Sequence, residues 1–271
     1  MAVSASAKRV AGWGLFAAGG YAALSLLANR SAFFPLKYPA GWWEAQGRLR
    51  AEDVWLTTPD KVRIHAWWVP AEGSRLATLF LHGNAGNVTH RADVLEAIPA
   101  AGSAVMMLDY RGYGKSEGWP TEKGLYQDAE AAYAYLVSRG HDPSNIIIHG
   151  ESLGSAVAVD LASRLECRLL ILEAPFPSAR AVANRVFPLL GPALVFGFDA
   201  RRKIANVRAP ILIIHGDRDE VIDFDLGKDL FTAAPQPKKF WQAPGAGHNN
   251  LRQVLGAEYG HRLAEIYRHG I

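Results

Sequence analysis

Short apolar runs alternate with longer amphipathic stretches along most of this chain. Runs of four to six mostly apolar residues are typical of strands buried on both faces, and they occur at 76–81, 104–108, 145–149, 169–172, 211–214 and 239–242. Apolar positions at helical spacing or good helix formers predict helices at 90–101, 122–139, 155–164 and 250–268. Strands that alternate with helices predict right-handed crossovers and a mostly parallel sheet covered on both faces.

Two further strands are expected before this alternation begins. Residues 54–58 and 62–69 flank the turn sequence Thr-Pro-Asp-Lys, a pattern typical of an antiparallel hairpin. The sequence therefore predicts an α/β fold with eight strands.

The pentapeptide Gly-Glu-Ser-Leu-Gly at 150–154 fits the pattern G-x-S-x-G. It lies between the strand expected at 145–149 and the helix expected at 155–164, so the chain must turn sharply there. Glycines flank the turn where a Cβ would strike the neighbouring strand or helix. The pattern predicts that Ser152 has a strained backbone and presents its hydroxyl at the edge of the sheet.

Two other polar loops also follow predicted strands. The strand at 211–214 leads into His-Gly-Asp-Arg-Asp at 215–219, and the last strand leads into Gly-Ala-Gly-His at 245–248. Functional groups of a parallel sheet gather outside the carboxyl ends of its strands, so Ser152, an aspartate of the first loop and His248 should lie close together. A serine hydroxyl needs such a neighbouring base to become a nucleophile.

From about residue 50 to its end, the chain resembles the α/β-hydrolase-fold serine hydrolases. It is most similar to the N-terminally anchored α/β-hydrolase-domain proteins, a group that includes protein depalmitoylases. The matching motifs are His-Gly-Asn-Ala-Gly at 82–86, Asp-Tyr-Arg-Gly-Tyr-Gly-Lys-Ser at 109–116, and the stretches 150–154, 215–219 and 247–249.

The resemblance implies a role for each candidate residue. Ser152, Asp219 and His248 would be nucleophile, acid and base, in the chain order of the α/β-hydrolase triad. Asp217 is the rival acid, expected instead to hold its loop by a backbone hydrogen bond.

The resemblance also implies an oxyanion hole made of backbone N–H groups. Leu153 and Asn84 are expected to supply them, with Ala85 as the alternative to Asn84. The stretch 109–116 is expected to form a tight, hydrogen-bonded turn beside the site.

Composition excludes several classes of protein. Hydrophobic residues make up 49% of the 271 positions, and the formal net charge is only +3, without a basic cluster or motif that would indicate a nucleic-acid partner. Cys167 is the single cysteine, so an internal disulfide and a zinc-ribbon site are excluded, and it is expected to pack at the start of a strand. The expected reaction needs neither a metal nor another cofactor.

The first thirty residues suggest a membrane anchor. Residues 10–28 carry no formal charge and as a helix would extend about 28 Å, close to the hydrocarbon thickness of a bilayer. A single-pass N-terminal anchor is the preferred interpretation. The sequence does not indicate which side of the membrane the domain at 31–271 faces. A cleaved signal peptide and a helix lying on the domain are the alternatives.

A short cap is expected at about 176–204, between two of the strands. Within it, residues 186–198 are uncharged but contain two prolines and are too short to span a bilayer. They could form a buried helical pair, an apolar wall for an acyl chain, or a face that rests on a membrane. Three tryptophans, at 67, 68 and 119, are expected to line the core or a pocket.

The sequence thus predicts a serine hydrolase that cleaves carboxylic esters or thioesters, of a small molecule or a lipid, through an acyl-serine intermediate. An amidase or peptidase and a lipid lipase would use the same triad. Haloalkane dehalogenases and epoxide hydrolases are disfavoured, because their similar folds have aspartate where this chain has Ser152. A membrane-tethered binding protein without turnover is the alternative from another class.

Overall fold

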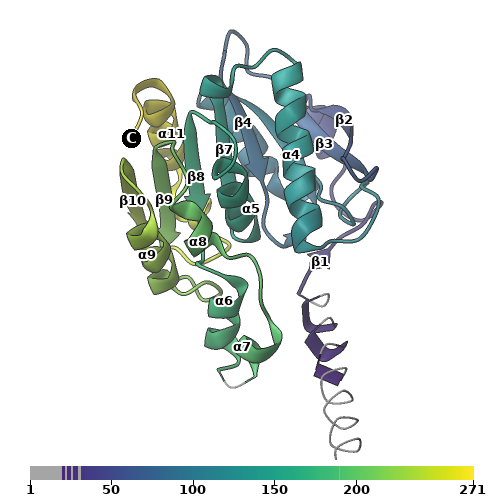
Figure 1. The fold of residues 1–271 in the computed structure, drawn as a ribbon. Coiled ribbons are helices and arrows are strands. Elements are labelled where there is room, and N and C mark those ends of the chain that lie inside the picture. Colours follow the sequence, from purple (N-terminus) through teal and green to yellow (C-terminus); the bar gives the residue numbers. More distant parts are fainter. Residues whose placement is uncertain (1–19, 22, 26, 30–31, 189) are drawn as a thin grey trace, which may run out of the picture.

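The computed structural model describes residues 20, 21, 23–25, 27–29, 32–188 and 190–271 (Figure 1). Its centre is an eight-stranded sheet, as expected, in which only the pairs β2–β3 and β3–β6 are antiparallel. In spatial order the strands are β10 (Lys238–Ala243), β9 (Ile211–Gly216), β8 (Leu169–Glu173), β7 (Ile146–Glu151), β4 (Ala77–Leu81), β6 (Ala104–Leu108), β3 (Arg63–Val69) and β2 (Glu52–Thr57).

Helices cover both faces of the sheet (Figure 1). Buried residues of α4 (Glu122–Ser138), α5 (Leu153–Ala162), α8 (Ala200–Ile204) and α9 (Phe224–Ala233) belong to one hydrophobic cluster. Those of α2 (Ala45–Leu49), α3 (Ala92–Ala100), α10 (Leu251–Leu255) and α11 (Ala257–His269) belong to another.

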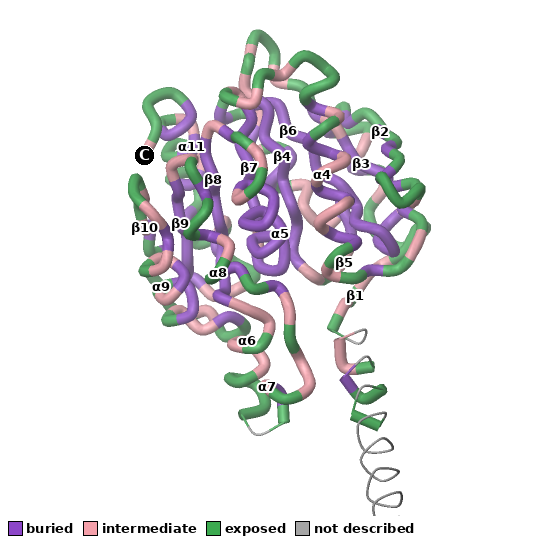
Figure 2. Tube along the Cα trace, viewed as in Figure 1, coloured by how far each residue is buried: buried purple, intermediate pink, exposed green. Residues whose placement is uncertain are grey.

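Successive residues of the central strands enter the two clusters in turn. On β7, Ile146 and Ile148 pack into the first cluster and Ile147 into the second. This follows from the period of two along a strand, and it explains why the runs are apolar throughout rather than alternating. The buried stretches of the tube in Figure 2 accordingly follow the sheet.

Smaller elements complete the fold. A two-stranded parallel sheet joins β1 (Phe34–Pro35) to β5 (Ala85–Gly86), the 3₁₀ helix η1 (Val88–Arg91) follows β5, and η2 (Pro143–Asn145) precedes β7. The helix expected at 250–268 is two helices, because Gly256 between them has φ +52°. Cys167 is buried two residues before β8, as expected.

The cap follows β8 and differs from one of the expectations. It consists of α6 (Ala179–Val186), α7 (Gly191–Leu194) and α8. Whereas α8 packs into the first cluster, the end of α6 and the residues around α7 expose apolar side chains: Val186, Phe187, Leu190 and Phe196 are each more than half exposed. The buried helical pair is therefore wrong for the described residues. Trp119 also differs from expectation, since it is 79% exposed, whereas Trp67 is fully buried in the core.

The predicted membrane anchor lies mostly outside the described residues. The described residues between 20 and 29 are helical. Among the residues that the structure describes, no helix has the length and apolar character needed to cross a bilayer.

Candidate active site

Ser152 occupies the turn between β7 and α5, as the sequence predicts. Its φ of 51° and ψ of −117° lie in a region that L-residues rarely adopt. Its backbone N–H donates to the carbonyl of Glu173 on the neighbouring strand, 2.8 Å away, which holds the turn in this conformation.

The two glycines of the turn have no room for a side chain. A Cβ on Gly154 would overlap the carbonyl oxygen of Leu81, and a Cβ on Gly150 would overlap the carbonyl oxygen of Gly154. The close approach of α5 to β4 and β7 thus depends on both glycines.

His248 and Asp219 form the hydrogen-bonded pair expected at the same edge of the sheet. The Nδ1 of His248 lies 2.8 Å from Oδ2 of Asp219, whose side chain is almost fully buried. The loops that hold them follow β10 and β9, which are parallel neighbours. An N–H donated from Nδ1 to the carboxylate leaves Nε2 as the proton-accepting atom of a neutral ring.

Asp219 is held ionised by its surroundings. Burial alone would raise the pKa of this carboxyl, but hydrogen bonds from His215 and His248 hold it well below its usual range. The backbone N–H groups of Val221 and Ile222 donate to Oδ1 at 2.9 and 2.7 Å.

Asp217 has the role expected of the rival carboxylate. Its Oδ1 accepts a hydrogen bond of 2.6 Å from the N–H of Gly245, and its Oδ2 one of 3.0 Å from the side-chain amide of Gln242. It braces the loop after β10 and makes no described hydrogen bond to His248.

Ser152 and His248 are not joined by a hydrogen bond within the described part of the chain. Such bonds are often long in unliganded enzymes and tighten when a substrate binds. Ser152 is buried, with 8% of the residue exposed.

Leu153 and Asn84, the residues expected to supply the backbone donors, lie directly after Ser152 and on the 82–86 loop. Leu153 is the first residue of α5, and neither its N–H nor that of Asn84 donates to another described residue. A Cβ built on Gly83 would lie 3.5 Å from the Cβ of Ser152, so the 82–86 loop passes close to the serine.

The 82–86 loop is fixed by neighbours on both sides. The hydroxyl of Tyr113 lies 2.9 Å from the backbone oxygen of Asn84, and the N–H of Phe34 donates to the Asn84 side chain at 3.3 Å. Tyr113 belongs to 109–116, which forms the expected hydrogen-bonded turn, with the N–H of Ser116 donating to Tyr113 O at 2.8 Å.

A cluster of charged residues beside Ser152 was not predicted from the sequence. Glu151 precedes the serine and forms ion pairs with Arg91 at 2.8 Å and with Arg252 at 3.1 Å. Arg252 also pairs with Glu173 at 2.7 Å. The position of Glu151 within the G-x-S-x-G pattern was the one signal available, because the partners come from distant parts of the chain.

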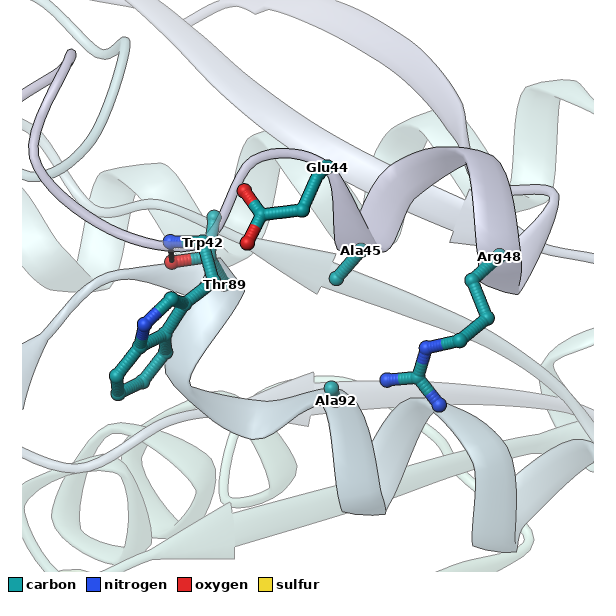
Figure 3. Close-up of a pocket in the computed structure, with 6 residues that line it drawn as sticks. All are labelled: Trp42, Glu44, Ala45, Arg48, Thr89 and Ala92. Atoms are coloured by element: carbon teal, nitrogen blue, oxygen red, sulfur yellow. Dashed lines mark hydrogen bonds between the residues drawn. The ribbon is translucent and has the colours of Figure 1, made fainter.

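The described residues contain no group of metal ligands, and one cavity in them is lined by residues outside the candidate triad. No group of three or more His, Cys, Asp or Glu side chains is placed to hold a metal ion there. A cavity of about 300 Å³ lies between α2 and α3, lined by Trp42, Glu44, Ala45, Arg48, Thr89 and Ala92 (Figure 3). None of these residues belongs to the candidate triad, and we assign the cavity no role.

This fold, with a serine on a strained strand-to-helix turn and a carboxylate–histidine pair at the same sheet edge, defines the class of α/β hydrolases. Comparison with known families agrees. The family model described as "Serine aminopeptidase, S33" matches residues 73–198.

Known proteins and solved structures lead to the same class. The α/β hydrolase domain-containing protein 17C of Xenopus tropicalis is 38% identical over 235 residues, 85% of this chain and 74% of that protein. An uncharacterized protein of Mycobacterium tuberculosis is 38% identical over 209 residues, 75% of this chain and 74% of that protein. An esterase of Pyrococcus furiosus shares the fold with a TM-score of 0.73 at 21% identity, covering 88% of this chain and 97% of the esterase.

The chain belongs to the α/β-hydrolase family. Its membership supports hydrolase chemistry.

Proposed function

We propose that the protein is a serine hydrolase that cleaves carboxylic esters or thioesters through an acyl-serine intermediate. The observation that carries this proposal is the buried, ionised Asp219 bound to Nδ1 of His248, on the loops beside a serine held at φ 51°. A binding scaffold has no physical need for this combination.

In the proposed reaction, the Ser152 hydroxyl attacks the acyl carbonyl while Nε2 of His248 removes its proton. The imidazolium that forms is stabilised by the Asp219 carboxylate. His248 then donates the proton to the leaving alcohol or thiol, and a water molecule releases the acyl group by the same steps in the second half of the cycle.

The developing negative charge on the carbonyl oxygen would be stabilised by the N–H groups of Leu153 and Asn84. Both groups are free of other described hydrogen bonds, and both belong to segments fixed by packing. Donors that need no reorganisation during the reaction make a large contribution to catalysis.

The acyl group is proposed to lie against the cap. Because the cap leaves the sheet at the end of β8, beside the strand that carries Ser152, its exposed apolar side chains are candidates for an acyl-binding wall. A buried acyl chain gains about 0.8 kcal/mol per methylene group, so acyl groups of medium length should be favoured over acetyl.

A membrane is the proposed place of action. The described N-terminal helical residues contact the cap, with Asn29 donating to Leu194 O at 3.0 Å and Tyr21 to Ala193 O at 2.5 Å. The large exposed apolar side chains Leu24, Leu27, Phe187, Leu190 and Phe196 lie on these two segments. Such a surface suits the interface of a bilayer that presents acyl substrates, with residues 1–30 as the anchor.

An aminopeptidase or amidase is the second candidate, favoured by the description of the family model that matches residues 73–198. It would use the same Ser152 and His248, because an amide nitrogen must also be protonated before it leaves. The two candidates differ in their substrates.

Purified protein assayed on p-nitrophenyl acetate and octanoate, the octanoyl thioester of a small thiol, and alanyl anilide distinguishes them. We expect turnover of the esters and the thioester, and losses on the order of 10⁴-fold or more in Ser152→Ala and His248→Ala. Preferred cleavage of the anilide would favour the aminopeptidase. Wild-type protein inactive on all of them would favour a binding protein.

A further inference from the structure

Arg91, Glu151, Glu173 and Arg252, here called the elbow charge cluster, lie beside Ser152 and are all largely buried. Glu151 and Glu173 are register partners on β7 and β8, so their carboxylates are neighbours. One guanidinium group, that of Arg252, bridges them with Nη2 at 3.1 Å from Glu151 and Nη1 at 2.7 Å from Glu173.

Each member of the cluster is linked to a different part of the candidate site, through the chain or through a hydrogen bond. Glu151 is bonded to the nucleophile, and the backbone oxygen of Glu173 accepts from the Ser152 N–H. Arg252 lies on α10, four residues after His248. Arg91 ends η1, which follows the 82–86 loop, and its Nε lies 3.0 Å from Glu151.

The two carboxylates depend on the arginines for their charge. Burial would raise the pKa of Glu151, but the charges of Arg91 and Arg252 hold it far below its usual range. Burial acts on Glu173 in the same way, and the charge of Arg252 again lowers its pKa. The other polar groups bonded to the cluster are His149 on β7, Asp93 on α3 and Tyr259 on α11.

We propose that Arg252 is a positioning residue, whose bridge to Glu151 and Glu173 holds the His248 loop in reaching distance of Ser152. The bridge ties the helix after the base to the residue before the nucleophile. Arg91 does the same for the 82–86 loop through Glu151. The inference rests on the proposed function, because it assigns Arg252 to the reaction that Ser152 and His248 perform.

The first test uses the full chain with Arg252→Lys, Arg252→Met and, as the matched control, Arg262→Met. Arg262 forms an exposed ion pair with Glu258 on α11 and has no described hydrogen bond to the cluster. We expect kcat on p-nitrophenyl acetate to fall about 10²-fold in Arg252→Met at nearly unchanged KM, because a displacement of about 1 Å costs that much. Arg252→Lys should lie in between and Arg262→Met should match the wild type.

Folding is checked by circular dichroism and the melting temperature, and rates are compared per folded molecule. If Arg252→Met does not fold, Arg252→Lys and Glu151→Gln replace it, and each is expected to fold with lowered kcat. Folded Arg252 variants with wild-type kcat, or with a change confined to KM, would overturn the proposal. An inactive wild type would instead contradict the proposed function.

The second test is the pH dependence of stability. In the wild type the pKa values of Glu151 and Glu173 are lowered on folding. Their ionised forms therefore stabilise the fold above about pH 4.3, and this stabilisation is lost as the pH falls. Without Arg252, burial and mutual repulsion raise the pKa of one of the two carboxyls, which therefore takes up a proton as the pH falls. The difference in melting temperature between the wild type and Arg252→Met should accordingly be smaller at pH 5 than at pH 8. The double variant Glu173→Gln/Arg252→Met should recover part of both the stability and kcat. A deficit independent of pH and no recovery would contradict the bridge.

Discussion

At the scale of single residues, the roles proposed for the two loop aspartates depend on which groups their oxygens accept from. Asp219 accepts from His248, and Asp217 accepts from Gly245 and Gln242 in the same region of the molecule. Two residues of separation in the sequence thus correspond to different hydrogen-bond partners and to different proposed roles.

Replacing each aspartate by asparagine tests this difference. Asp219→Asn is expected to lower kcat by about 10⁴-fold, because the amide no longer fixes the tautomer of His248 or stabilises its charge. Asp217→Asn should stay near the wild-type rate, since an amide oxygen can still accept from Gly245. Steady-state ester hydrolysis measures both, and a reversed ranking would show that the acids have been assigned wrongly.

The pH dependence of acylation follows from the same pair. Asp219 stays ionised because its pKa lies well below its usual range. The acylation rate should rise with pH, because only a neutral imidazole can accept the Ser152 proton. Pre-steady-state release of p-nitrophenol measures this step. A rate constant that does not change between about pH 5 and 9 would exclude a histidine base.

At the scale of elements, close contact between α5 and two strands determines the shape of the turn that holds Ser152. Gly154→Ala would place a methyl group against the Leu81 carbonyl, and we expect it to lower the free energy of unfolding by about 2–3 kcal/mol. Gly260→Ala on α11 is the control, because a Cβ there meets open space and should stabilise the helix by about 0.5–1 kcal/mol. Urea denaturation measures both, and equal effects would contradict the close packing.

Most of the elements could be predicted because their signals are local. The strand at 104–108 and the helix at 122–138 follow directly from apolar runs and helical spacing. The cap was less predictable, since uncharged residues such as Leu190 suit a buried helix and an exposed surface equally well. Trp119 lies at 79% exposure beside Lys37, a cation–π arrangement that sequence spacing does not reveal.

Some residues of the candidate site could likewise be predicted from local sequence signals, and others could not. Ser152, Asp219 and His248 each follow a recognisable strand, so their placement at the same edge of the sheet could be predicted. The bridge from Arg252 to Glu151 and Glu173 joins residues up to about a hundred positions apart, and its formation depends on side-chain geometry that no motif encodes.

At the scale of the whole molecule, the proposed action at a membrane rests on the exposed apolar side chains of the cap and of the described N-terminal residues. We expect Leu190→Asp/Phe196→Asp to reduce hydrolysis of an acyl substrate in anionic vesicles at least tenfold, because it replaces the surface that would enter the bilayer. Turnover of soluble acetyl ester should change little. The matched control is Val137→Asp, at an exposed apolar position of α4 outside the cap.

Vesicle flotation gives a second readout for the same variants. Equal vesicle binding and equal vesicle turnover by wild type, the cap variant and Val137→Asp would show that the exposed side chains of the cap do not contact the bilayer. Truncation of residues 1–30 should weaken vesicle turnover further while sparing the soluble ester.

The central claim is that Ser152 is a nucleophile activated by His248 and Asp219. The most direct measurement is covalent labelling by a fluorophosphonate probe, followed by mass-spectrometric mapping of the modified peptide. We expect a single adduct on Ser152, no labelling of Ser152→Ala, and labelling slowed by orders of magnitude in His248→Ala. Folded wild-type protein that stays unlabelled, or an adduct on another residue, would contradict it.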